Sequence, residues 1–176
     1  GTIQSLYLTG SLNTGYNKVG PLVGEIFGGK IMNVVCDVEV TSDYPGDGAI
    51  SGLVGRGSAD GSLIENCIFA GNITGNNWNS AAFIGWSGSL STLTNCAFTG
   101  IIDVDTSQGN SYTFARNPGN VTCNNCYYVN EFVAHQDNTI QISEEDVTSG
   151  KLCYLLNGDQ TQIVWNQTIE DSEIPV

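Results

Sequence analysis

The sequence predicts an all-β fold, a right-handed parallel β-helix or β-solenoid of about five coils of ~30 residues each, with a short helical cap at the C-terminal end. Two apolar strings recur with one period, and the segments between them are rich in the turn formers Gly, Asn, Ser and Asp. Units that repeat at this spacing bury their apolar faces only by stacking on one another.

The first string carries an asparagine at its centre. That slot falls at Ser5, Asn33, Asn66, Asn95 and Asn125, with steps of 28, 33, 29 and 30 residues. The string is short and rich in Val, Ile, Leu and Phe, which favours a strand over a helix. Because copies of one slot stack in register, we expect the asparagine side chains to form an amide ladder at a corner of the coil.

The second string comes half a repeat later and reads Gly-Leu-Val-Gly in its clearest copy, residues 52–55. The other copies are 21–24, 82–85 and a degraded one at 113–116, so the last residues are separated by 31, 30 and 31 positions. Two anchors with the same period indicate a stacked repeat more strongly than one, because chance apolar clustering does not keep both in phase.

The apolar slots predict three ladders in the core. They are Ile3, Ile31, Ile64, Leu93 and Cys123; Leu6, Val34, Cys67, Cys96 and Cys126; and Leu12, Val40, Ile73, Ile102 and Phe132. Stacked copies lie about 4.8 Å apart, farther than the roughly 3.8 Å between the Cβ atoms of a disulfide. We therefore expect buried free thiols. The alternative is a zinc or redox site at Cys123-x-x-Cys126, for which no second such pair exists.

Residues 1–132 form the predicted solenoid, and residues 133–176 form the predicted cap. A short helix is expected near 143–157, where a serine precedes three acidic residues and leucines recur at helical spacing. A strand-like segment at 163–165 and an acidic tail follow. We expect the cap to cover the open end of the stack, whose strands would otherwise be unpaired.

The net charge is −13, from 18 acidic and 5 basic residues. It argues against nucleic acid and anionic membranes as partners, since both need Lys/Arg patches. The cations are scattered along the sequence at Lys18, Lys30, Arg56, Arg116 and Lys151. The acidic residues of the last third are interpreted as solubilising and helix-capping, with a calcium site as the alternative, and no cofactor or metal is expected.

No apolar run reaches the roughly twenty residues that span a bilayer, so membrane insertion is not expected. Gly1 runs directly into the first repeat. We therefore expect the chain to be part of a longer protein, with an upstream neighbour stacked on its first coil.

The pairing of Gly-Leu-Val-Gly strings with Ile-x-Asn-Cys strings resembles the GLUG-motif repeats of bacterial surface proteins. Residues 52–55 are the clearest copy, and Thr113-Phe114-Ala115-Arg116 departs from the pattern. The tail 149–158, followed by Trp165 and the final Pro175-Val176, looks like the ending of many secreted Bacteroidetes proteins. GLUG repeats occur in adhesin-like proteins and in non-catalytic regions of IgA-specific metalloproteases. The resemblance implies a secreted or cell-surface location and no catalytic residues to carry over.

The chain shows few candidate catalytic groups. Its single histidine, His135, lies in a predicted loop, and neither a Gly-x-Ser-x-Gly elbow nor a phosphate-binding glycine loop is present. The alternative is a carbohydrate-active β-helix enzyme, a polysaccharide lyase or glycosidase, which needs paired carboxylates. The candidates for such a pair are Asp37, Glu39, Asp103 and Asp105.

A ligand-binding surface is predicted in the loops that vary between copies. Tyr16, Tyr44 and Trp78 follow the asparagine slot by eleven or twelve residues and sit among Asn, Asp and Gly. Aromatic faces beside polar groups suit sugars or peptide side chains. The leading interpretation is a non-enzymatic extracellular module, adhesive or a spacer, that binds a glycan or a host surface protein. A further alternative is an assembly element that pairs through its open N-terminal coil.

Overall fold

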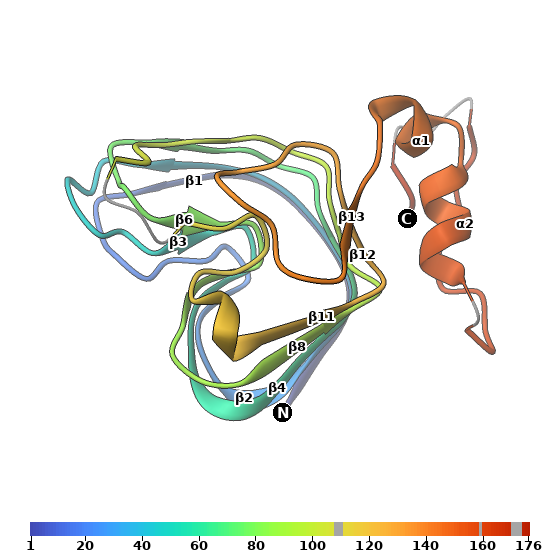
Figure 1. The fold of residues 1–176 in the computed structure, drawn as a ribbon, viewed down its shortest axis with the longest axis horizontal. Coiled ribbons are helices and arrows are strands. Elements are labelled where there is room, and N and C mark those ends of the chain that lie inside the picture. The colour runs from blue at the N-terminus through green and yellow to red at the C-terminus, as the bar shows by residue number, and fades with distance from the viewer. Residues whose placement is uncertain (108–110, 159, 170–173) are drawn as a thin grey trace.

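The computed structural model describes residues 1–107, 111–158, 160–169 and 174–176. It confirms the predicted fold class: parallel strands wind into a β-solenoid of about four turns, with short helices near the C-terminus (Figure 1). The count is lower than the five coils expected because five copies of the asparagine slot delimit only four complete turns between them.

Long strands at the N-terminal end give way to shorter ones along the stack, and every strand pair is parallel. The strands are β1 (Thr2–Thr14), β2 (Val23–Ser42), β3 (Ile50–Ser51), β4 (Val54–Phe69), β5 (Ile73–Gly75), β6 (Ser80–Ala81), β7 (Ile84–Ser87), β8 (Ser91–Thr94), β9 (Ala97–Phe98), β10 (Ile102–Asp103), β11 (Val121–Asn124), β12 (Cys126–Tyr128) and β13 (Thr139–Gln141). A 3-10 helix, η1 (Pro118–Asn120), precedes β11.

The strand register confirms the first predicted core ladder throughout and the third from Leu12 to Ile102, whereas Phe132, the predicted last member of the third, is buried but lies in no strand. Ile3 pairs with Ile31, Ile31 with Ile64, Ile64 with Leu93, and Leu93 with Cys123. From the second coil onward the side chains of this ladder are at most 1% exposed. The first coil differs because β1 pairs only with β2: Leu6 was predicted as interior, yet it is 45% exposed.

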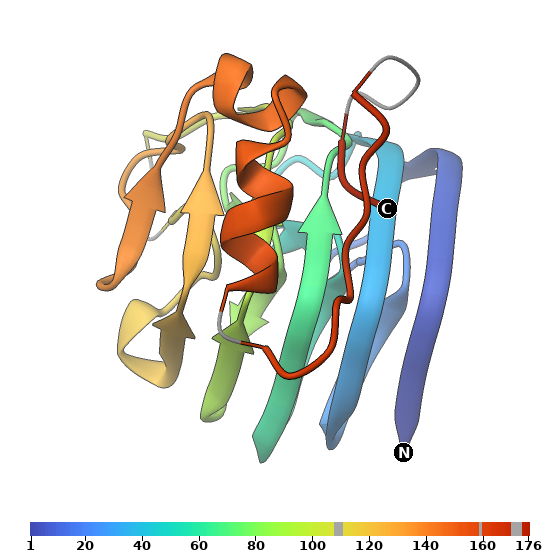
Figure 2. The same cartoon turned by 90° about the vertical axis from the view of Figure 1, so that its right-hand side faces the viewer.

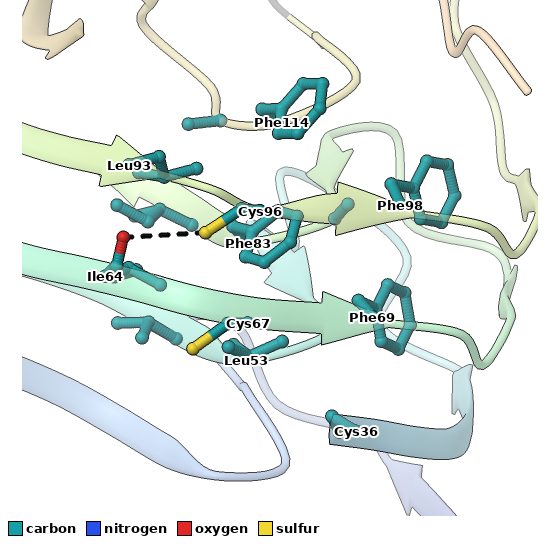
Figure 3. Close-up of a cluster of buried hydrophobic side chains, with 14 of the residues drawn as sticks. Cys36, Leu53, Ile64, Cys67, Phe69, Phe83, Leu93, Cys96, Phe98 and Phe114 are labelled. Atoms are coloured by element: carbon teal, nitrogen blue, oxygen red, sulfur yellow. Dashed lines mark hydrogen bonds between the residues drawn. The ribbon is translucent and has the colours of Figure 1, made fainter. Parts of the chain in front are cut away.

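Rings and thiols stack through the centre of the core (Figure 3). Phe69 stacks on Phe98 and Phe83 on Phe114, with ring centroids 5.7 and 5.6 Å apart. All six cysteines are free thiols, and all but Cys153 are buried, as predicted. The Sγ of Cys96 donates to the carbonyl oxygen of Ile64 at 3.5 Å. Burial raises the pKa of Cys36 to about 12, so this thiol remains protonated at neutral pH.

The asparagine slot turns the chain at the corner between two faces of the coil. Each of the four asparagines has a left-handed backbone, with φ between 51° and 54°. From Asn66 onward, the Nδ2 of each donates to the Oδ1 of the preceding copy at 3.2 Å (Asn66 to Asn33), 3.2 Å (Asn95 to Asn66) and 2.7 Å (Asn125 to Asn95). The predicted amide ladder is therefore confirmed. Asparagine suits the slot because it tolerates the left-handed region better than other non-glycine residues.

The final glycine of the second string makes room for the loop of the preceding coil. A Cβ atom on Gly55 would lie 2.1 Å from the backbone oxygen of Lys18, and one on Gly85 would lie 2.2 Å from that of Ala49. Gly24 has open space at this position, because it lies in the first of these copies. The recurrent glycine thus allows a close backbone approach in the second and third copies.

The C-terminal helical region consists of two helices, α1 (Glu144–Thr148) and α2 (Lys151–Asn157), where one near 143–157 was predicted. Gly150, with φ 85°, breaks the helix between them. Ser143 caps α1 as expected: its Oγ accepts from the backbone N–H of Asp146, and the Asp146 carboxylate accepts from the N–H of Ser143.

The helices do not cover the end of the stack, which corrects the predicted place of the cap. Instead α2 lies on the outer flank of the solenoid, with its axis running in about the same direction as the strands (Figure 2). Leu152, Leu156 and Trp165 pack on a column that has one residue from each of four coils. The members of that column are Val35, Ile68, Ala97 and Tyr127. The Nδ2 of Asn125 also donates to the Leu155 carbonyl at 3.2 Å, which joins α2 to the amide ladder.

The segment 163–165 does not form the strand that was expected. Ile163 is 76% exposed, whereas Trp165 is 3% exposed and belongs to the flank cluster. Asn166 and Val176 form two backbone hydrogen bonds with each other, each 2.9 Å long. The Oδ1 of Asn157 on α2 accepts from the backbone N–H groups of Val164 and Trp165 at 2.9 and 3.0 Å, so the segment is held by this side chain as well as by the buried Trp165 ring.

A buried glutamine side chain satisfies backbone hydrogen-bonding groups in the last turn of the solenoid. The side chain of Gln136 is buried, accepts from the backbone N–H of Phe114 at 3.0 Å and donates to the carbonyl of Ala115. Strand β13 adds a final parallel pairing to β12. In this way an amide side chain replaces the backbone of a next coil. Within the described ranges no helix is both long and apolar enough to cross a membrane.

Candidate functional site

The predicted aromatic residues sit in loops that follow strands: Tyr16 follows β1, Tyr44 follows β2 and Trp78 follows β5. Thr14 pairs with Ser42 in the parallel register, so Tyr16 and Tyr44 occupy equivalent places two residues later. Their backbone N–H groups donate to Thr14 Oγ1 at 3.1 Å and to Ser42 Oγ at 3.3 Å. Tyr16 is 78% exposed, whereas Tyr44 is half-buried.

Tyr44 and Trp78 meet over the loop at Gly46. A Cβ atom on Gly46 would lie 3.3 Å from the Tyr44 ring and 3.7 Å from the indole nitrogen of Trp78. The backbone N–H of Trp78 donates to the Gly46 carbonyl at 3.0 Å. The structure therefore brings these two predicted residues together, while Tyr16 extends from the neighbouring coil into solvent.

Beside Tyr44 lies a hollow of about 290 Å³ that the sequence did not reveal. It adjoins Ala49, the residue before β3 (Figure 1). We call it the loop hollow, and its lining residues are Asn17, Lys18, Tyr44, Asp47, Ala49, Arg56 and Trp86. The hollow therefore combines two aromatic side chains, two cations, a carboxylate and an amide.

Arg116 supports the wall of the loop hollow from behind. Its guanidinium pairs with both carboxylate oxygens of Asp47, through Nη1 and, at 3.0 Å, through Nη2. It also lies over the Trp86 ring, with Cζ 4.4 Å from the ring centroid. The Arg116 side chain is 5% exposed and that of Asp47 is 41% exposed. A buried bidentate pair with a stacked indole fixes both Asp47 and Trp86 in place.

The structure corrects the reading of the cations as scattered. Lys18 and Arg56 line the loop hollow and Arg116 lies behind it, so three of the five basic residues gather there. Arg56 also pairs with Glu25, its Nη1 lying 3.4 Å from Oε1. This is a local concentration of positive charge on a chain whose net charge is −13.

The sequence did contain a signal for this cluster. Arg116 stands in the slot that is glycine in the three preceding copies of the second string, and Ala115 still bridges to Ile84 as the repeat requires. A departure from a repeat whose backbone pairing is kept points to a side chain with a separate task. Its partner Asp47, 69 residues away, could not be identified from the spacing.

The four carboxylates that were candidates for an enzymatic pair do not line the loop hollow. Asp37 and Glu39 belong to β2 and Asp103 to β10, and β5 lies between these two strands. Glu39 Oε1 accepts from the amide of Asn72 at 3.1 Å, so it is part of a side-chain ladder. The backbone N–H of Ser107 donates to Asp105 and holds the pKa of this exposed carboxylate below its usual value.

The candidate catalytic histidine and part of the candidate calcium site make contacts within the protein. His135 contacts Glu131 and the Tyr128 hydroxyl, the latter at 3.1 Å from Nδ1. Of the acidic residues weighed as a calcium site, Asp146 caps α1 and pairs with Lys151, while Glu170, Asp171 and Glu173 lie outside the described residues. The described part of the chain contains no group of three or more His, Cys, Asp or Glu side chains placed to hold a metal ion.

Comparison with known proteins identifies a likeness of fold. No protein-family model matches the chain, and no curated protein matches it in sequence. A crystal structure of a candidate immunoglobulin A1 protease from Bacteroides ovatus is similar, with a TM-score of 0.71 and 17% sequence identity. The similarity covers 100% of this chain, which spans 57% of that chain's length. At this identity the likeness shows the fold alone.

Proposed function

We propose that this chain is a non-enzymatic, extracellular module of a bacterial cell-surface protein that recognises a glycan or a host surface protein through its loops. The observation that carries the proposal is the convergence of Tyr44 and Trp78 next to the loop hollow. Exposed and half-exposed rings with nearby amide, carboxylate and cationic groups are what carbohydrate and peptide recognition require.

The repeat itself supports a scaffold role. The residues that recur, chiefly the asparagines and the final glycines of the second string, serve backbone geometry. Among the residues that vary between copies, Tyr44 lines the loop hollow, Trp78 meets Tyr44 beside it, and Arg116 holds two of its lining residues. The resemblance to GLUG-motif surface proteins, with the secreted location it implies, points in the same direction.

The proposal is tested by screening the purified chain against a glycan array and against host surface proteins that include immunoglobulin A1. We expect binding that Trp78→Ala or Tyr44→Ala weakens about tenfold, in line with the loss of a stacked aromatic contact. Tyr154→Ala is the matched control, because Tyr154 is 79% exposed on α2 and does not line the loop hollow. Absence of binding to any probe would remove the recognition role and leave a spacer, and binding that all three variants leave unchanged would exclude this loop surface as the site.

The same samples test the enzymatic alternative. Incubation with polysaccharides and with immunoglobulin A1, followed by chromatography and gel analysis, should show no cleavage products. Cleavage that Asp103→Asn or Glu39→Gln abolishes would establish the enzymatic alternative instead.

Pairing through the first coil is a second candidate function, favoured by the exposed edge of β1. Residues 2–14 contain no charged side chain and no proline, which are the usual devices that keep an edge strand from pairing. Light scattering of the purified chain should then show a dimer that Leu6→Lys dissociates. A monomer at every concentration up to about 100 µM, on the scale of weak contacts, would exclude this role.

A further inference from the structure

The loop hollow carries a local charge opposite to that of the chain. Its lining contains the cations Lys18 and Arg56 and the carboxylate of Asp47. Behind the lining, Arg116 pairs with Asp47, and Glu25 pairs with Arg56. Three positive and two negative charges leave one net positive charge, on a chain with a net charge of −13. A carboxylate group of a ligand is attracted to this local positive charge.

The cations retain hydrogen-bond donors for such a group. Lys18 is exposed, and within the described residues it has no ion-pair partner. Arg56 pairs with Glu25 through Nη1 at 3.4 Å, and it has no second ion-pair partner in the described part of the chain. Both side chains line the hollow, so a carboxylate inside it can accept from an ammonium and a guanidinium together.

The rest of the lining suits a hydroxylated ring rather than a peptide. Tyr44 and Trp86 offer aromatic surface, while Asn17 and Asp47 offer an amide and a carboxylate beside it. Arg116 holds Asp47 in a bidentate pair, which fixes the position of this carboxylate as an acceptor for ligand hydroxyl groups. Sugar rings present hydroxyl groups at their edges and C–H groups on their faces, which matches this lining.

We propose that the loop hollow binds a carboxylated sugar, either a uronate within a chain or a terminal sialic acid. This inference rests on the proposed recognition function and names its ligand class. The carboxylate lies between Lys18 and Arg56, the ring lies against Tyr44 and Trp86, and Asp47 accepts from the ring hydroxyls. Arg116 is a positioning residue, since it holds Asp47 and Trp86 and does not line the hollow.

The test uses matched probes on the full chain in isothermal titration calorimetry. Oligogalacturonate is compared with its methyl ester, and sialyllactose with lactose, so each pair differs in the carboxylate charge or in the acidic sugar. We expect the acidic member of at least one pair to bind about tenfold or more tightly than the neutral member, and its affinity to fall between 50 and 300 mM salt. The pair that responds identifies the source of the carboxylate.

Variants then locate the charge. Lys18→Met and Arg56→Met should each weaken binding of the acidic probe about tenfold. Lys30→Met is the matched control, because Lys30 is an exposed lysine of β2 that does not line the hollow, and it should leave affinity unchanged. Tyr44→Phe retains the ring and should bind the acidic probe nearly as tightly as the wild type. Tyr44→Ala removes the ring and should bind it more weakly.

The outcomes separate this inference from the broader function. Equal binding of acidic and neutral sugars, or equal losses from Lys18→Met and Lys30→Met, would overturn the carboxylated-sugar site while leaving glycan recognition standing. Tighter binding of a poly-glutamate peptide than of any sugar would overturn the sugar class. Cleavage of a bound oligogalacturonate would support the site and overturn the non-enzymatic role. Absence of binding to every probe at millimolar concentration would overturn the carboxylated-sugar site, whereas the broader recognition function fails only if the glycan array and the host-protein screen are negative as well.

Discussion

The asparagine of each repeat has a backbone task that few other residues perform. Asn66 combines a φ of 51° with side-chain hydrogen bonds to the copies before and after it, so it turns the corner and ties three coils together. Ser5 occupies the same slot in the first coil, also with a positive φ of 58°. The slot is thus defined first by the backbone conformation and second by the ladder.

Replacing Asn66 separates these two contributions. Asn66→Gly keeps the left-handed backbone and loses the ladder bonds, while Asn66→Ala loses the bonds and adds the strain of a left-handed alanine, about 1–2 kcal/mol. We expect Asn66→Ala to lower the free energy of unfolding by about 1 kcal/mol more than Asn66→Gly, in urea titrations with an unchanged m-value. Equal losses would show that the ladder alone accounts for the residue.

Between neighbouring elements, the second string is a packing device. Its last glycine lets the loop before β3 and the loop before β2 press against the following coil, and Arg116 occupies this slot only in the fourth copy. There the arginine side chain fills the space behind the loop hollow and pairs with Asp47. One position therefore serves tight packing in some coils and a potential binding surface in another.

The glycine requirement is tested by a pair of identical substitutions. Gly85→Ala should destabilise the chain by about 1–3 kcal/mol, because its Cβ would lie 2.2 Å from the Ala49 carbonyl oxygen and the backbone must shift. Gly24→Ala should be nearly neutral, because nothing lies within 4 Å of its Cβ position. Thermal unfolding of both variants provides the comparison, and similar melting temperatures would contradict the packing argument.

The flank helix α2 should stabilise the solenoid through one face only. Leu152 is fully buried on it, so Leu152→Ala should cost about 2–5 kcal/mol. Tyr154→Ala, on the exposed face of the same helix, should change the free energy of unfolding by less than about 0.5 kcal/mol. A melt of α2 that precedes the main transition in the Leu152→Ala variant would show that the helix unfolds on its own, whereas equal effects would contradict the one-sided docking.

In the molecule as a whole, the buried thiols make the free energy of unfolding depend on pH in the alkaline range. The ordinary thiol pKa is 9.0, and burial raises that of Cys36 to about 12. The pKa of Cys96 is raised by burial, and that of Cys123 by its hydrogen bond with Cys126 and by burial. Between these values the unfolded chain releases thiol protons that the folded chain keeps, so the folded state loses stability as pH rises above about 9.

This pH dependence is measured by urea midpoints from pH 7 to 10.5. We expect a plateau up to about pH 8.5 and a decline above it, with a shallower decline in Cys36→Ala. Cys153→Ala serves as the comparison, because Cys153 is only half-buried. Ellman's reagent should label the buried thiols only after unfolding, and rapid labelling of all six in the folded chain would contradict the picture.

In a solenoid, residues with the same structural role recur at a fixed spacing in the sequence. This made it possible to predict the repeat period, the strand ladders, the free thiols and the asparagine corner. A slot that recurs near every thirty residues must stack, and stacking determines register and core together. The prediction that Leu6 is interior was wrong because a slot is buried only where its strand has a neighbouring coil on both sides. Strand β1 has a neighbour on one side only.

The place of the C-terminal helices and the loop hollow were decided only by the tertiary structure. The amphipathic face of α2 indicated burial, yet nothing in its sequence distinguished the end of the stack from its flank, where Val35, Ile68, Ala97 and Tyr127 form an apolar column. Likewise, Lys18, Asp47 and Arg116 are far apart in sequence and meet because loops of different coils lie side by side. Repetition specifies what recurs, and the contacts between non-repeating segments depend on how the finished coils stack.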